Sequence, residues 1–132
     1  MQPESPKPLT WVGSSKRDYM LFPDQVQDDM GYALFVAQMG ERPPRAKPLR
    51  GFKGAGVLEL VEHYDGNAYR MVYTVRFAQR VYVLHAFQKK SKRGMATPKS
   101  EIRLIEQHLR AAEEDYHQRQ QQDEWKGQER WQ

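Results

Sequence analysis

The chain has 132 residues, the length of one domain, with 39% hydrophobic residues, 29% charged residues and a net charge of +4. It has no cysteine, which excludes disulfide scaffolds, thiol nucleophiles and thiolate metal sites. No apolar run approaches the roughly 20 residues that span a bilayer, and the N-terminal residues lack the apolar core of a secretory signal. We therefore expect a cytoplasmic protein with no membrane partner.

Positive charge is concentrated in the middle of the chain. Residues 42–100 contain 13 Lys or Arg against three acids, whereas residues 1–41 contain six acids against three bases. The last 20 residues also contain six acids against three bases. A polyanionic partner for the middle segment explains this distribution, and so does an ordinary solvated basic surface.

The first 41 residues predict a strand and a helix. Residues 1–8 are rich in Pro and Ser and predict a flexible N-terminus, residues 9–13 predict a short strand, and residues 16–21 predict a helical turn. A longer helix begins at Pro23, since proline is tolerated at a first helical position, and ends at Gly40. Its apolar stripe at helical spacing consists of Val26, Met30, Ala33, Leu34 and Ala37.

A basic loop rich in Pro and Gly, residues 42–56, precedes three strand-like runs. The runs are residues 57–64, 68–77 and 81–87. Asp65-Gly66, between the first two runs, is a strong hairpin signal. The short connections predict an antiparallel meander.

The last helix is predicted to begin with Thr97 as N-cap and Pro98 at the first helical position, and to end at Tyr116. Residues 117–132 have no apolar period and predict a polar, disordered tail. The domain then covers residues 9–116. Strand, helix, three strands and helix predict an α+β fold whose helices pack on one face of an antiparallel sheet.

Side-chain alternation sorts the strand residues onto two faces, provided that both hairpin loops have an even number of residues and no bulge intervenes. The more apolar face, expected to meet the helices, contains Leu58, Leu60, Tyr69, Met71, Tyr73, Val75, Leu84 and Ala86. The other face contains Glu59, Val61, His63, Arg70, Val72, Thr74, Arg76, Val81, Val83, His85 and Phe87.

This second face has the side chains that phosphodiester chemistry needs. Guanidinium groups match phosphate geometry, and histidine transfers protons near neutral pH. RNA supplies its own nucleophile, the 2′-hydroxyl, and with no cysteine, no HExxH and no compact acidic cluster we expect no metal and no cofactor. The alternative interpretation is that Arg70 and Arg76 are solvated and that His63 and His85 are ordinary sheet residues.

Three segments form a recognisable set. The sequence HAFQKKSK at residues 85–92 is followed by Thr97-Pro98 and Glu101-Ile102, YRMVY lies at residues 69–73, and Leu49 to Gly51 and Glu59-Leu60 form a further stretch. Together they resemble the RelE/HigB-type toxins of type II toxin–antitoxin systems, most closely the phage-derived branch of that superfamily.

The resemblance implies a RelE-like fold and a metal-independent, ribosome-dependent mRNA endonuclease that arrests translation. Its expected partners are mRNA, the ribosome and a neutralising protein antitoxin, commonly a helix-turn-helix protein. The alternative is a non-catalytic toxin-like binding protein, either a ParE-type gyrase inhibitor or an inactive homologue.

The resemblance assigns phosphate stabilisation to Arg70 and RNA binding to the basic loop with Lys89, Lys90 and Lys92, and the argument from the strand faces adds proton transfer at His85. The predicted catalytic residues are Arg70, His85, Lys89 and Lys90. The predicted RNA-binding residues are Arg50, Lys53, Arg76, Lys92 and Arg93.

Overall fold

The computed structural model describes residues 5–52, 54–90 and 97–130. Its elements are β1 (Leu9–Trp11), α1 (Ser15–Tyr19), α2 (Asp24–Gln38), β2 (Lys47–Pro48), β3 (Val57–Tyr64), β4 (Asn67–Thr74), β5 (Val81–Lys90) and α3 (Lys99–Arg130). One sheet contains the five strands in the order β1-β5-β4-β3-β2. The predicted α+β class and the strand–helix–meander–helix order are confirmed, with β2 added inside the predicted basic loop.

The β3–β4 hairpin sets the register of the meander. Asp65 and Gly66 form its two-residue turn with φ values of 49° and 80°, the positive values that a type I′ turn requires. Tyr64 pairs with Asn67 directly across the turn. β5 continues the antiparallel meander beside β4, and β1 pairs in parallel with β5 at the edge of the sheet.

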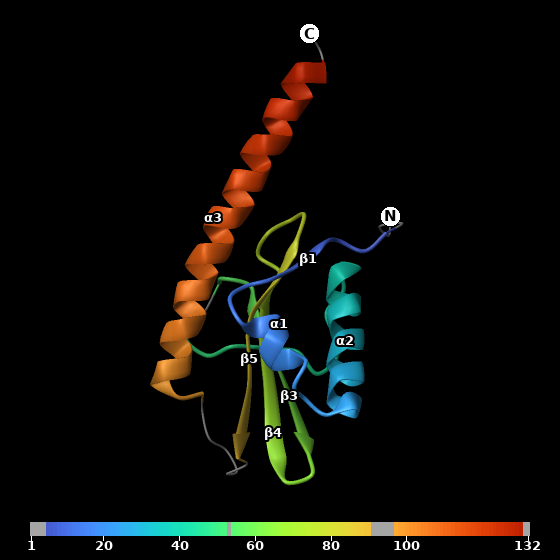
Figure 1. The fold of residues 1–132 in the computed structure, drawn as a ribbon, viewed down its shortest axis with the longest axis vertical. Helices are drawn as coiled ribbons and strands as arrows, with labels where there is room; N and C mark the ends of the chain where they lie inside the picture. The colour runs from blue at the N-terminus through green and yellow to red at the C-terminus, as the bar shows by residue number, and fades with distance from the viewer. Residues whose placement is uncertain (1–4, 53, 91–96, 131–132) are drawn as a thin grey trace.

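Helices cover both faces of the sheet, which corrects the prediction that they share one face. Figure 1 shows α2 on one side of the strands and α3 on the other. The core on the α2 face includes Leu60, Met71 and Tyr73. The core on the α3 face includes Val72, Tyr82, Leu84, Ile105 and Leu109. The strands carry apolar residues on both sides, so each side needs a helix to exclude water.

A β-bulge explains why the sorting of side chains fails along β5. Val72 pairs with His85, but the next residue, Tyr73, pairs with Val83, so Leu84 is an extra residue in the ladder. As a result Val83 joins the α2 face with Tyr73, whereas Leu84 joins the α3 face, both opposite to the prediction. His85 keeps the predicted face, which it shares with Val72.

The helix boundaries follow the predicted signals with two differences. The first difference is that α2 and α3 begin one residue after a proline rather than at it. The carbonyls of Pro23 and Pro98 accept the first helical hydrogen bonds, from the backbone N–H groups of Gln27 and Ile102. Gly40, with φ of 86°, follows the end of α2 as predicted. The second difference is that α3 continues past Tyr116 to Arg130, so the predicted disordered tail is helical over residues 117–130.

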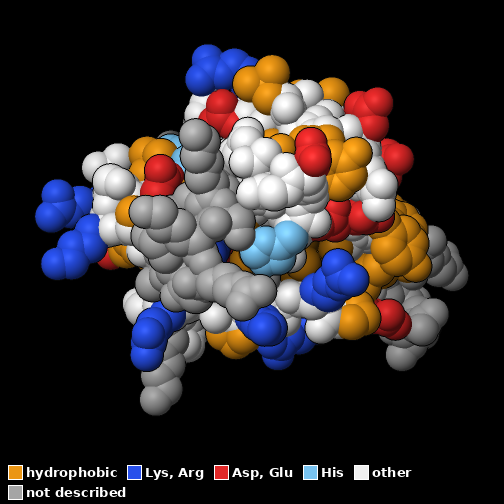
Figure 2. Space-filling model, turned by 90° about the horizontal axis from the view of Figure 1, so that it is seen from below, with side chains coloured by type: hydrophobic (Ala, Val, Ile, Leu, Met, Phe, Trp, Pro, Cys, Tyr) orange, Lys and Arg blue, Asp and Glu red, His pale blue; other side chains and the backbone are white. Residues whose placement is uncertain are grey.

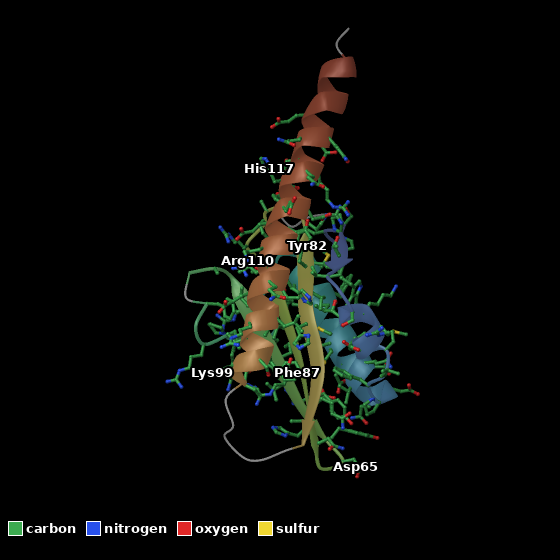
Figure 3. The ribbon with its side chains drawn as sticks, turned by 60° about the vertical axis from the view of Figure 1, so that its left-hand side comes forward. Asp65, Tyr82, Phe87, Lys99, Arg110 and His117 are labelled. Atoms are coloured by element: carbon green, nitrogen blue, oxygen red, sulfur yellow. The ribbon has the colours of Figure 1, made fainter. Side chains whose placement is uncertain are left out.

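α3 is attached to the sheet through its first two thirds, where Ile102, Ile105, Leu109, Ala112 and Tyr116 belong to the core on this face. Figure 3 shows it crossing β5, with Lys99 near Phe87 and Arg110 level with Tyr82. Tyr82 donates a 2.7 Å hydrogen bond to Asp115, which also accepts one from Arg119 at 2.7 Å. Burial opposes ionisation of Asp115, but these two donors lower its pKa below the ordinary value.

Among the helices of the described residues, none combines the length and the apolar character of a membrane span.

Candidate nucleic-acid interface

Arg70 lies in the middle of β4 on the α3 face, directly opposite Val61 of β3. Its guanidinium Nη1 is 3.3 Å from Glu59 Oε2, and the two side chains are only 14% and 19% exposed. Glu59 is two residues before Val61 on the same face, a diagonal neighbour within reach of a long side chain. The ion pair therefore holds the Arg70 guanidinium against the sheet in one orientation.

A groove of about 890 Å³ opens beside this ion pair. We call it the basic groove; β3, β4, the loop after α2 and the beginning of α3 form its walls. Its charged and imidazole side chains are Arg45, Lys47, Arg50, Arg70, Glu59 and His63. Four cations against one carboxylate leave a net charge of +3 with a neutral imidazole. A groove of this charge favours a polyanion such as a nucleic-acid backbone.

His63 supplies the imidazole of this groove. It pairs with Ala68 near the end of β3, and since it is two residues beyond Val61 it lies on the Arg70 face. Its side chain is exposed. Figure 2, the view from below, shows histidine exposed at this end of the molecule, with Lys and Arg side chains among its neighbours. An imidazole open to solvent and beside a guanidinium can exchange protons with a bound ligand.

His85 does not lie on an open surface, which corrects the expectation from strand parity. It is 5% exposed, and its Nε2 interacts with the Glu101 carboxylate in the first turn of α3. Its ring stacks on Phe87 at 4.9 Å between centroids and meets the His108 ring edge-on at 6.3 Å. α3 therefore covers His85, and a catalytic role for it stays a prediction.

The other predicted site residues divide into three groups. Arg50 is exposed and lines the basic groove. Arg76 lies outside it, paired with Glu113 of α3 and 5.8 Å from the centre of the Phe77 ring. Lys89 and Lys90 end β5, but their side chains lie outside the described part of the chain. Lys53, Lys92 and Arg93 lie outside the described residues.

Three basic residues of the basic groove, Arg45, Lys47 and His63, are absent from the predicted site. Arg45 and Lys47 come from the Pro-rich basic loop, whose charge is evident in the sequence but whose path is not. The two-residue turn predicts the correct face for His63. The predicted site nevertheless contains His85 instead, because His85 belongs to the sequence signature at residues 85–92. Within the described part of the chain, no three His, Asp or Glu side chains gather closely enough to hold a metal ion.

Comparison with known proteins identifies the family. The family model of phage-derived Gp49-like proteins (DUF891) matches residues 18–110, most of the chain. No protein with a curated description matches the sequence. The RelBE2 toxin–antitoxin complex of Mycobacterium tuberculosis contains a chain with 20% identity and a TM-score of 0.45, covering 69% of this chain and 100% of that one. A mutant of the E. coli toxin RelE in the free state has 18% identity and a TM-score of 0.45, covering 62% of this chain and 82% of that one. The family match covers the three segments that suggested the phage-derived branch, and this chain belongs to the phage-derived Gp49-like family.

Proposed function

We propose that this protein is the toxin of a type II toxin–antitoxin pair and that it binds and cuts mRNA in the basic groove while the mRNA is on the ribosome. The observation that carries the proposal is the convergence of three further cations and one exposed histidine around the largely buried Arg70. The resemblance of the Lys-Lys signature and of the YRMVY strand to RelE/HigB-type toxins supports the same assignment.

The proposed reaction needs only the RNA and the protein. The 2′-hydroxyl loses its proton and its oxygen forms a bond to phosphorus, while the bond from phosphorus to the 5′-oxygen breaks and that oxygen gains a proton. The products end in a 2′,3′-cyclic phosphate and a 5′-hydroxyl. Negative charge grows on the non-bridging oxygens in the transition state, where the guanidinium of Arg70 stabilises it.

We assign one of the two proton transfers to His63, because its imidazole is exposed in the same groove as Arg70. Lys47 and Arg50 line the remainder of the groove and would hold neighbouring phosphates. In this proposal His85, buried under α3 with Glu101, supports the position of the first α3 turn. The partner that neutralises the toxin is a protein antitoxin, for which a helix-turn-helix protein is one expected form.

Single-turnover cleavage on programmed ribosomes tests the proposal. We expect Arg70→Ala to slow cleavage by about 10²- to 10³-fold, the scale of losing one preorganised donor. Arg70→Lys should recover only part of this loss, because an ammonium group cannot reproduce the two-pronged contact of a guanidinium. Arg17→Ala is the matched control, since the Arg17 side chain is 78% exposed on α1 and does not line the groove.

The proposal fails if a folded Arg70→Ala protein cuts at the wild-type rate. The gyrase alternative is separated by pulse labelling after induction in cells. We expect protein synthesis to stop first, whereas an early arrest of DNA synthesis with continued translation would favour a ParE-type inhibitor.

A further inference from the structure

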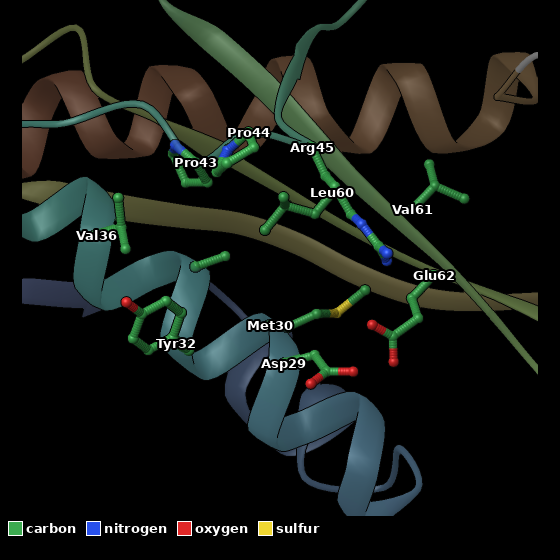
Figure 4. Close-up of a pocket in the computed structure, with 11 residues that line it drawn as sticks. Asp29, Met30, Tyr32, Val36, Pro43, Pro44, Arg45, Leu60, Val61 and Glu62 are labelled. Atoms are coloured by element: carbon green, nitrogen blue, oxygen red, sulfur yellow. The ribbon is translucent and has the colours of Figure 1, made fainter.

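A second groove lies on the other face of the sheet, between α2 and β3. It has a volume of about 380 Å³. Figure 4 shows that one end is apolar, formed by Val36, Pro43 and Pro44, and that two carboxylates meet at the other end. The carboxylates belong to Asp29 of α2 and Glu62 of β3, and we call this the carboxyl groove.

The two carboxylates are close enough to share a proton. Burial raises the pKa of Glu62 from 4.5 to about 7, helped by the hydrogen bond that protonated Glu62 donates to Asp29 and by the charge of Asp29, while the nearby Arg45 opposes the rise. Figure 4 shows the Arg45 guanidinium extending from the loop toward Glu62. On the sheet side, the residue paired with Glu62 is the buried Tyr69 of β4. Two acids, one guanidinium and one phenol are therefore the ionisable groups at this end.

Apolar surface continues from the carboxyl groove onto α2. Tyr32 lines the groove and is 70% exposed, and Phe35 on the same helix is 47% exposed. Large exposed aromatic residues beside an apolar groove are typical of surfaces that bind another protein. The carboxylates at the end of the groove disfavour a phosphate backbone, because like charges repel.

We propose that the carboxyl groove docks a protein partner that inserts a Lys or Arg side chain between Asp29 and Glu62 and packs a neighbouring apolar side chain against Val36, Pro43 and Pro44. The charge of the groove specifies this chemistry. A cation replaces the shared proton and, together with Arg45, neutralises both carboxylates, whereas a purely apolar ligand leaves the proton in place. The inference does not depend on RNA cleavage, since the groove lies on the opposite face from Arg70.

This exchange of a proton for a cation makes docking depend on pH. The cationic side chain competes with the proton on Glu62, so affinity rises as that proton is lost. With a pKa of about 7, the fraction of free carboxylate and hence the affinity should rise about tenfold between roughly pH 6 and pH 8.

The test uses the full chain and two short peptides, N-acetyl-leucyl-leucyl-arginine amide and the same peptide with citrulline in place of arginine. Citrulline has the shape of arginine but no charge. Titrations followed by amide NMR should show shifts at Asp29, Val36 and Glu62 with the arginine peptide, tighter binding at higher pH, and much weaker binding of citrulline. Glu62→Gln should weaken the arginine peptide and abolish its pH dependence.

The matched control is Glu106→Gln, which removes one exposed carboxylate on α3. It should leave both the affinity and the pH dependence unchanged. Equal binding of the two peptides, or shifts confined to the basic groove, would overturn the proposal. Sedimentation that shows a dimer broken by Tyr32→Ala would also overturn it, because the occupant would then be a second copy of this chain.

Discussion

The two faces of the sheet differ in charge although one strand supplies residues to both. β3 directs Glu59, Val61 and His63 toward the basic groove, while the intervening Leu60 and Glu62 lie on the α2 face. The α3 face has four groove cations, and the α2 face has a carboxyl pair with one guanidinium. The alternation of side chains along β3 and β4, together with the basic loop after α2, therefore builds two surfaces with opposite preferences on one small domain. Arg45 lines both grooves and separates them.

The largest expected effect distinguishes the open and covered parts of the α3 face. His63→Ala should slow ribosomal mRNA cleavage by about 10²-fold, the low end of general acid–base catalysis, with an unchanged melting temperature. His85→Ala should instead lower the free energy of unfolding by about 1–3 kcal/mol, because it removes the buried partner of the Glu101 carboxylate. Single-turnover rates and urea unfolding of both variants provide the measurement. The assignment of the site would be contradicted if both variants cut mRNA at the wild-type rate and His85→Ala also kept the wild-type stability.

The next effect concerns the contact that supports the bulge. His108 Nδ1 lies 2.5 Å from the carbonyl of Leu84, the extra residue of β5. A Cβ on Gly13, which has φ of 57°, would lie 2.8 Å from the His108 ring. Gly13→Ala should therefore cost more than the roughly 1–2 kcal/mol of a left-handed backbone alone, because the His108 ring must also move.

Gly40→Ala is the matched control for this change. Gly40 has φ of 86°, but a Cβ added to it would have no neighbouring atom within 4 Å, so its substitution adds backbone strain without a clash. Urea midpoints of the two variants measure the difference. Equal losses of stability would show that His108 is not held in place beside Gly13.

Salt dependence separates the two grooves. RNA affinity should fall with ionic strength, because phosphates release their condensed cations on binding. Arg50→Ala should reduce the slope of log K against log salt by about 0.7 for single-stranded RNA, the value of one phosphate contact. Glu62→Gln should leave the slope unchanged, because it lies in the other groove. Filter-binding titrations in increasing KCl give both slopes, and an unchanged slope for Arg50→Ala would place the RNA elsewhere.

The pH dependence of stability tests the carboxyl pair without any ligand. The folded chain keeps the proton of Glu62 up to about pH 7, whereas the unfolded chain releases it near 4.5. Between these values the folded state binds more protons, so the stability that this proton confers is lost as pH rises. Urea unfolding at pH 5 and pH 8 should show a smaller decline for Glu62→Gln than for the wild type. An identical decline would contradict a shared proton.

The smallest expected effect is at the end of α3. Residues 121–124 are exposed, beyond the contacts of Tyr116 with Phe77 and of Arg119 with Asp115. Removal of residues 123–132 should leave the melting temperature nearly unchanged, because their sequence has no apolar period that would form a buried stripe. A large fall on calorimetry would show that this segment packs on the domain.

Local chemistry determined much of the fold. Asp65-Gly66 specifies the turn, because few other residue pairs accept two positive φ values, and that turn correctly placed Arg70, Glu59 and His63 on one face. The stripe from Val26 to Ala37 and the terminator Gly40 predicted α2 almost to the residue. These signals operate over a few residues, so the sequence by itself contains them.

Only the tertiary structure decided which residues are open to a ligand. The bulge at Leu84 reverses the faces on which the side chains of the first half of β5 lie. Nothing in the local sequence marks this bulge, since the residue that contacts the Leu84 carbonyl is His108, 24 residues away. α3 covers His85 but leaves the groove beside Arg70 open, a choice made by the packing of Ile105 and Leu109 on Tyr82 and Leu84. Arg45 and Lys47 reach the groove because the chain after α2 runs along the edge of the sheet, where β2 pairs with β3 and Lys47 lies opposite Glu59. Residue types therefore indicated the chemistry to look for, whereas long-range packing decided which of those side chains are open to a ligand.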